Sequence, residues 1–271
     1  FPDSSRPDLT VRVHFSKVTP NQESLYSTIK LRTTNRKKYQ PTPLTVHQKN
    51  EILGSAREIG TGEVRLIEDK VKMSAVAQAM SVNEIVMLEN RILHDLFFRE
   101  VVWTEEEEKR HGGGLYLKTL ELKPPQQAVF KILRYWPAMS LFNKIGFAKV
   151  IAKDNASVYG SGAAMGAIII NNEDSEFINA GRLMERIWLK ATKMGLSLQL
   201  ITGVLFLWQK ISGEGSKEFS TSHTAMIKDA YEQVRRTFGV ENGIIALLFR
   251  VGIDGNPSAR SIKLPPQIIF K

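Results

Sequence analysis

Two apolar runs constrain the fold of this chain more than any other feature. Residues 159–170 are small and β-branched, a composition typical of a strand buried on both faces, and residues 244–251 form a second such run. Gly162 and Gly166 in the first run would allow a neighbouring segment to approach closely. We therefore expect the first run to be the central strand of a sheet and the second to be another buried strand.

Amphipathic segments surround these runs. Thr45 is placed to cap a helix that extends to about residue 57, with Ile52, Leu53 and Ala56 facing inward. Apolar and polar side chains alternate in residues 63–68 and in residues 11–15, and this alternation predicts two strands. The mixed order of helices and strands favours an α+β fold, with a mixed sheet of about four or five strands covered by helices.

Residues 70–103 form the longest helical stretch, because apolar side chains recur there at three- and four-residue steps. We predict a break at Ser81, which would cap a second helix with Glu84 as its capping-box partner.

Two further helices are expected in the second half of the chain. Residues 179–194 present one apolar face, and Gly195 follows at the C′ position that favours glycine. For the last helix we predict Ser222 as the cap and Gly239 as the residue that ends it.

A helical insertion is expected at about residues 104–153. An acidic run follows Thr104 at a helix start, where the helix dipole favours negative charge. Neighbouring carboxylates on a helix point in different directions, so we predict no metal site there. Residues 124–153 form an amphipathic, aromatic-rich hairpin, with Val150 in its apolar set. This hairpin could be a lid over a site, a partner-binding surface or ordinary core.

Composition excludes several kinds of site. The chain has 271 residues and no cysteine, which excludes disulfide scaffolds, Cys-ligated zinc, iron–sulfur clusters and thiol nucleophiles. Its five histidines, at positions 14, 47, 94, 111 and 223, include no close pair, so a His-based metal site is not expected. No apolar run is long and uninterrupted enough to span a membrane, and we predict a soluble, cytoplasmic protein.

The formal charge of +9 suggests an anionic partner, and two segments place cations beside hydroxyl groups. In residues 32–39, R-T-T-N-R-K-K-Y, Arg32 and Arg36 could bracket a phosphate while Thr33 and Thr34 complete the cage. Residues 250–263 end in a similar set of cations and hydroxyls. The alternative for each segment is a solvated basic loop.

Three stretches, in the family's order, resemble the FMN-dependent nitroreductase superfamily. Residues 32–39 resemble its N-terminal phosphate motif, and residues 180–196 resemble its long core helix, which ends in A-x-x-x-G-L. Residues 248–265 resemble its last strand and the basic loop after it. The resemblance implies one nitroreductase-like domain over residues 1–271, with a mixed, largely antiparallel sheet flanked by helices and an extended C-terminal arm.

The same resemblance implies an enzyme in which the flavin carries out the chemistry, so no catalytic acid or base is assigned. FMN would take hydride from NAD(P)H and pass it to a small nitroaromatic or quinone-like acceptor. The residues implied to hold the flavin phosphate are Arg32, Thr33, Thr34, Arg36, Arg260, Ser261 and Lys263. Those implied to line the flavin ring are Gln199, Thr202 and Gly203.

The sequence opens on Phe1-Pro2-Asp3, without an initiator methionine or a signal-peptide pattern, so we expect a piece of a longer chain. Its arrangement resembles a divergent branch of the superfamily in which two degenerate halves are fused and imitate the usual homodimer. The upstream half of that branch carries a flavin-contacting motif with Asn, Gln, Pro and Trp, which does not occur here. We therefore expect either a homodimer or an intramolecular pseudo-dimer with a missing N-terminal half.

Two alternatives differ in function. In the first, the hairpin at residues 124–153 covers the flavin, and the protein stores or sequesters FMN without reductase activity. The second is a basic nucleic-acid-binding protein, suggested by the charge of +9. The basic residues are dispersed, however, and no helix-turn-helix or RNA-binding signature is present. We therefore expect neither a nucleic-acid partner nor a membrane partner.

Overall fold

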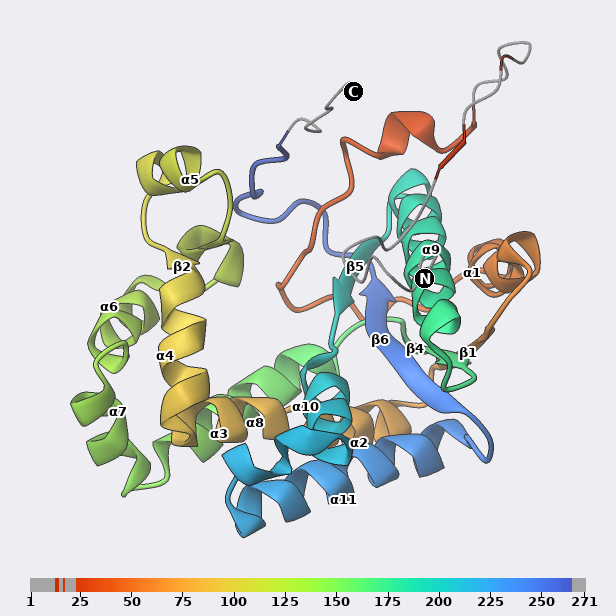
Figure 1. Ribbon diagram of the computed structural model, residues 1–271. Helices are drawn as coiled ribbons and strands as arrows, with labels where there is room; N and C mark the ends of the chain where they lie inside the picture. Colours follow the sequence, from red (N-terminus) through yellow and green to blue (C-terminus); the bar gives the residue numbers. More distant parts are fainter. Residues whose placement is uncertain (1–12, 15–16, 18–22, 265–271) are drawn as a thin grey trace.

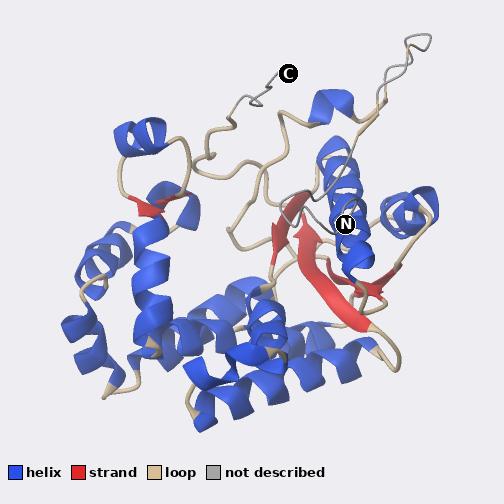
Figure 2. Cartoon of the chain, viewed as in Figure 1, coloured by secondary structure: helices blue, strands red, loops and turns tan. Residues whose placement is uncertain are grey.

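The computed structural model describes residues 13–14, 17 and 23–264, and it confirms the α+β fold. One sheet contains β1 (Glu63–Ile67), β4 (Ala164–Ile170), β6 (Ile244–Gly252) and β5 (Ser197–Leu200), paired in the order β1-β4-β6-β5. Each neighbouring pair in this sheet is antiparallel. The two apolar runs supply the two inner strands, as predicted, although the first strand begins only at Ala164 and Tyr159 still belongs to the preceding helix. Figure 1 shows the sheet on one side of the molecule, and Figure 2 shows how much of the chain around it is helical.

The inner strands bury both faces because their side chains alternate. In β4, Ala164 and Ile168 face one hydrophobic cluster, whereas Met165 and Ala167 face the other. Full burial of a side chain such as Ile168 contributes about 1.5–3 kcal/mol. Gly166 is needed for the close approach of β6.

Helices cover the two faces of the sheet separately. The first cluster is covered by α1 (Val46–Ile59) and α9 (Asp174–Lys193). The second is covered by α2 (Lys70–Met80), α10 (Gly203–Ser212) and α11 (Thr221–Phe238). Short 3-10 helices precede α1 and α11, namely η1 (Tyr26–Thr28) and η3 (Glu214–Glu218).

A lobe of helices lies beside the sheet, to the left in Figure 1. Its elements are α3 (Val82–Glu89), α4 (Arg91–Glu100), β2 (Val101–Val102), α5 (Glu105–His111), β3 (Leu115–Tyr116), η2 (Leu117–Leu120), α6 (Pro124–Leu133), α7 (Trp136–Asn143) and α8 (Phe147–Tyr159). The lobe has its own hydrophobic cluster, which includes Phe98, Leu133 and Met139. Residues 104–153 are thus largely helical, but the predicted hairpin at residues 124–153 is wrong: the segment forms three helices, and Val150 is exposed.

The predicted helix caps have mixed outcomes. Thr45 and Thr104 each form a capping box, with Gln48 and Glu107 respectively. The break predicted at Ser81 is present, because this one residue separates α2 from α3, but the capping box predicted there is wrong: Ser81 keeps helical dihedral angles and makes no side-chain cap bond. Its hydroxyl donates to the carbonyl of Gln78 at 2.8 Å instead.

Two further predictions need correction. The last helix is capped by Ser220, two residues before the predicted cap at Ser222, although Gly239 ends it as expected. Leu53 was expected to face inward but is 40% exposed, whereas Ile52 is buried. Of the strand predicted at residues 11–15, only residues 13 and 14 are described, and neither is assigned to a strand; the arm after residue 264 lies outside the described residues. Among the residues that are described, no helix is both long enough and apolar enough to cross a bilayer.

Candidate functional site

The two basic segments meet beside β5, although more than 200 residues separate them in sequence. The ammonium of Lys263 donates to the backbone carbonyls of Ile29 at 2.7 Å, Lys30 at 3.0 Å and Arg32 at 2.6 Å. These carbonyls follow η1, where orphan acceptors and the helix dipole both favour a cation. The C-terminal segment therefore fixes the position of the N-terminal one, and Figure 1 shows the two segments crossing close to β5.

The junction carries an excess of positive charge. The guanidinium of Arg32 lies 3.0 Å from a carboxylate oxygen of Glu185 and 4.5 Å from the ring centroid of Trp188. Partial burial lowers the pKa of Lys263, and the charges of Arg32 and Arg260 lower it further. Three cations thus lie near one another, and among the described residues Glu185 is the carboxylate that ion-pairs with them. An anion bound here would relieve their mutual repulsion.

Asn35 holds this junction to the sheet, a role that the sequence analysis missed. Its backbone N–H donates to the carbonyl of Leu198 at 3.2 Å, next to a parallel bridge between Thr34 and Leu198. Its buried side-chain amide donates to Ser197 Oγ at 3.1 Å and to the carbonyl of Gly255 at 3.3 Å. As a result, Thr33 and Thr34 are half-buried, and their hydroxyls lie on the segment that also carries Arg32.

The remaining candidates for phosphate binding are Arg260, Ser261 and Arg36, and they do not all lie at the junction of the two basic segments. Arg260 and Ser261 are exposed, and Arg260 donates to Asn256 Oδ1 at 2.9 Å. Arg36 points away from the cation cluster and donates to the carbonyl of Thr119 at 3.1 Å. Burial lowers the pKa of Arg36. The structure therefore gathers Arg32, Arg260 and Lys263, and it places Arg36 toward the helical lobe.

Arg250 forms a second, buried cationic centre against the N-terminal basic segment, residues 32–39. Its guanidinium lies 3.9 Å from the ring centroid of Tyr39 and is fully buried. It donates to the carbonyl of Lys37 at 2.6 Å, to Ser161 Oγ at 2.7 Å and to Gln199 Oε1 at 2.9 Å. Burial lowers the pKa of Arg250 to about 10. An arginine within an otherwise apolar strand was the sequence signal for this centre.

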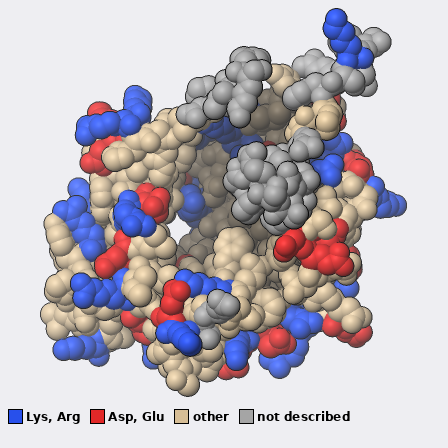
Figure 3. Space-filling model, viewed as in Figure 1, with Lys and Arg blue, Asp and Glu red and all other residues tan. Residues whose placement is uncertain are grey.

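The three ring candidates lie at the end of β5 and the start of α10. Gln199 is buried, and its amide oxygen is already used by Arg250. Thr202 precedes α10 without making a side-chain cap bond. Gly203 packs against α3, and a Cβ built there would lie 2.3 Å from Asn83 Cγ. Figure 3 shows this face of the molecule hollowed between the helical lobe and the sheet, with Lys and Arg side chains inside the hollow.

A buried acid lies on α3. Glu84 accepts a hydrogen bond from the Tyr159 hydroxyl at 2.6 Å, and its other carboxyl oxygen has no hydrogen-bond partner. Burial raises the pKa of Glu84 to about 7. Burial also raises the pKa of Tyr159, and the neighbouring Glu84 carboxylate adds to that shift. The S-x-x-E spacing had predicted a capping role for Glu84, so its burial was not foreseen.

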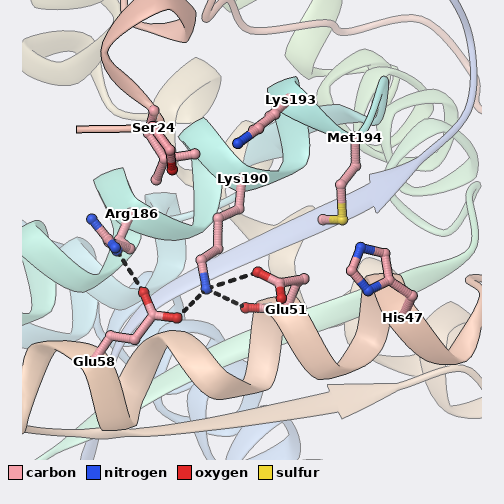
Figure 4. Close-up of a pocket in the computed structure, with 9 residues that line it drawn as sticks. Ser24, His47, Glu51, Glu58, Arg186, Lys190, Lys193 and Met194 are labelled. Carbon is pink, nitrogen blue, oxygen red and sulfur yellow. Dashed lines mark hydrogen bonds and ion pairs between the residues drawn. The ribbon is translucent and has the colours of Figure 1, made fainter. Parts of the chain in front are cut away.

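A separate depression of about 470 Å³ lies between α1 and α9 (Figure 4). Its central cation, Lys190, pairs with Glu51 Oε2 at 3.1 Å and also with Glu58. Arg186 pairs with Glu58 at 2.7 Å. The lining contains none of the ten predicted cofactor residues. These neutralised pairs hold α1 against α9 and do not offer a free anion site.

Known proteins were compared with this chain by sequence and by structure. No protein-family model matches it, and neither does any curated protein. Among solved structures it is similar to a nitroreductase with bound FMN from Bacteroides fragilis, with 10% identity and a TM-score of 0.48 over 92% of this chain and 100% of that one. It is also similar to the NADPH:FMN oxidoreductase from Vibrio harveyi complexed with NAD+, with 13% identity and a TM-score of 0.47 over 90% of this chain and 74% of that one. A third similar structure is a nitroreductase-like family protein from Bacillus cereus, with 12% identity and a TM-score of 0.44 over 93% of this chain and 99% of that one. At this level of identity, no residue role is carried over from these structures.

Proposed function

We propose that this chain binds FMN and acts as an oxidoreductase of the nitroreductase type. The observation that carries the proposal is the Lys263 ammonium seated on the carbonyls that end at Arg32. This contact joins two distant basic segments into one cation cluster. Such a cluster suits the phosphate of a mononucleotide, because guanidinium groups present paired donors to phosphate oxygens and an ammonium adds a point charge.

The residues present fit the phosphate end of the cofactor directly. Those that would hold the phosphate are Arg32, Thr33, Thr34, Arg260, Ser261 and Lys263. Those that would lie toward the ring are Arg36, Gln199, Thr202 and Gly203. Bound FMN would supply hydride acceptance and donation, with NAD(P)H as the donor and a nitroaromatic or quinone-like molecule as the acceptor. The residues of the chain would bind the FMN, orient its ring and limit the access of water to it.

The buried Arg250 would preorganise this site. Arg250 holds the carbonyl of Lys37, so the loop that carries Arg32 and Arg36 is tied to β6 from beneath. Thr34 and Asn35 tie the same loop to β5. A loop fixed at both points loses little conformational entropy when an anion binds, which raises affinity. In the proposed working unit, a second copy of this chain completes the site.

Visible absorbance tests the proposal. The full chain is mixed with FMN, passed through a desalting column and titrated anaerobically with NADPH. A retained yellow flavin that is bleached by NADPH, and restored by a quinone, is the expected result. A retained flavin that NADPH cannot bleach would support storage instead of reduction. A colourless protein would contradict flavin binding itself.

A further inference from the structure

The outward side of the helical lobe combines positive charge with exposed apolar side chains. Between residues 122 and 153 the sequence has no Asp or Glu; the nearest acids are Glu121 and Asp154. The cations in this stretch, all exposed, are Lys123, Lys131, Arg134, Lys144, Lys149 and Lys153. We call the exposed side chains of residues 123–153, which form α6, α7, the first part of α8 and their connections, the basic apolar surface.

Large apolar side chains alternate with these cations along the same helices. Those that are exposed are Val129 at 38%, Ile132 at 53%, Tyr135 at 55%, Leu141 at 64%, Ile145 at 78% and Val150 at 54%. Single exposed apolar residues are ordinary, but Leu141 and Ile145 lie four residues apart at the end of α7 with the exposed Lys144 between them, and apolar side chains grouped with charge in this way are typical of an interaction surface.

Packing of the lobe does not require these side chains. The inward faces of the same helices supply Leu133, Met139 and Ala148 to a cluster with Leu88 and Phe98. The lobe therefore already has a core, and the outward apolar residues are left in water. Exposure of apolar side chains to water is unfavourable, and contact with a lipid or a protein partner would remove this cost.

The surface is convex at the turn between α7 and α8. Gly146, with φ +79°, allows this tight turn and leaves Lys144 and Ile145 exposed at its tip. Figure 1 shows the turn at an outer corner of the molecule, and Figure 3 shows Lys and Arg side chains spread over the lobe among uncharged residues. A projecting turn with the apolar side chain of Ile145 and flanking cations can insert into a soft surface, but it cannot enclose a small ligand.

We propose that the basic apolar surface docks onto an anionic lipid bilayer. Lysine and arginine would lie against lipid phosphates, while Leu141 and Ile145 would enter the boundary between headgroups and acyl chains. A nucleic acid would satisfy the cations but would leave the aliphatic side chains in water. Docking of this kind needs no membrane-spanning helix. The proposal therefore replaces the expectation of no membrane partner, and it is independent of the proposed flavin chemistry.

Vesicle co-sedimentation with the full chain tests the proposal. The vesicles are phosphatidylcholine alone, or phosphatidylcholine with roughly a third phosphatidylserine, at about 0.1 M salt. Wild type is expected to pellet with the anionic vesicles and much less with the neutral ones. Leu141→Ser with Ile145→Ser, and separately Lys144→Glu with Lys149→Glu, should each weaken binding by about tenfold or more.

The matched controls are Val71→Ser and Lys72→Glu on α2, where both side chains are exposed and neither belongs to the basic apolar surface. These should bind vesicles like wild type, and circular dichroism should show that every variant is folded. The proposal is overturned if wild type stays in the supernatant with anionic vesicles. It is also overturned if the serine variants bind like Val71→Ser, if duplex DNA is bound in place of vesicles, or if the serine pair changes only the oligomeric state.

Discussion

Replacement of Arg250 by methionine should destabilise the protein in a way that can be worked out from its contacts. The side chain is fully buried and donates four hydrogen bonds, to Lys37, Val158, Ser161 and Gln199. Methionine is flexible and apolar, so it fills much of the same space without a donor. The perturbation therefore removes hydrogen bonds and a stacked guanidinium with limited loss of volume.

Two of the four acceptors keep another partner after the change. The carbonyl of Val158 still accepts from the Ser161 backbone N–H at 3.1 Å, and Ser161 Oγ still accepts from the Tyr39 N–H at 3.0 Å. The carbonyl of Lys37 and Gln199 Oε1 lose the donor that the structure gives them. Gln199 is buried and Lys37 is half-buried, so at about 1–3 kcal/mol for each acceptor left unpaired, and with some relief from no longer burying a charge, the expected loss is about 3 kcal/mol.

Urea unfolding followed by tryptophan fluorescence measures this loss. Arg250→Met should lower the free energy of unfolding by about 3 kcal/mol. Adding Gln199→Leu removes one of the two unpaired acceptors, so the double variant should recover about 1 kcal/mol relative to the sum of the single changes. A loss below about 1 kcal/mol for Arg250→Met, or strict additivity in the double variant, would refute the reasoning.

The remaining predictions concern a buried acid and two glycines. Burial raises the folded-state pKa of Glu84 from 4.5 to about 7, so wild-type stability should fall as the pH rises across that interval. Glu84→Gln should abolish this fall, and above about pH 7 its free energy of unfolding should exceed that of wild type by a margin on the order of 3 kcal/mol. Urea unfolding at several pH values measures this, and a variant whose stability depends on pH as wild type does would contradict the prediction. Gly166→Ala places a Cβ 2.2 Å from the Phe249 ring and should cost about 1–3 kcal/mol. Gly181→Ala, in α9 with no heavy atom within 4 Å of the added Cβ, should instead add about 0.5–1 kcal/mol; thermal unfolding that ranks the two alike would contradict this account.

The sequence predicted the sheet well because its inner strands are apolar over their whole length. The apolar runs of β4 and β6 are typical of strands buried on both faces, and Gly166 leaves room for the ring of Phe249. The caps show the limit of local reasoning. Thr104 and Ser81 both stand three residues before a glutamate, yet the box forms only at Thr104.

The physical reason lies in what surrounds each motif. An extended residue at Thr104 leaves its hydroxyl free to cap α5, whereas Ser81 joins two helices directly. Glu84 then faces Tyr159 from α8, a contact across 75 residues that no local pattern contains. The contacts of the candidate site join residues that are still farther apart in sequence. The order of the basic motifs suggested that Arg32 and Lys263 would meet, but the backbone carbonyls that hold Lys263 carry no sequence signal.

The central claim is that the joined basic segments bind the phosphate of FMN, and a comparison of FMN with riboflavin tests it most directly. Riboflavin has the same ring without the phosphate. Fluorescence quenching should show that wild type prefers FMN by about 100-fold or more, since charge-assisted hydrogen bonds each contribute about 1.5–3 kcal/mol. Arg260→Gln should reduce that preference by about tenfold or more.

The matched control is Arg182→Gln on α9, because Arg182 is also exposed and also donates to an asparagine oxygen, Asn179 Oδ1, at 3.2 Å. It should keep the wild-type preference. Equal affinity of wild type for FMN and riboflavin, or equal behaviour of the two arginine variants, would contradict a phosphate site at the junction of the two basic segments.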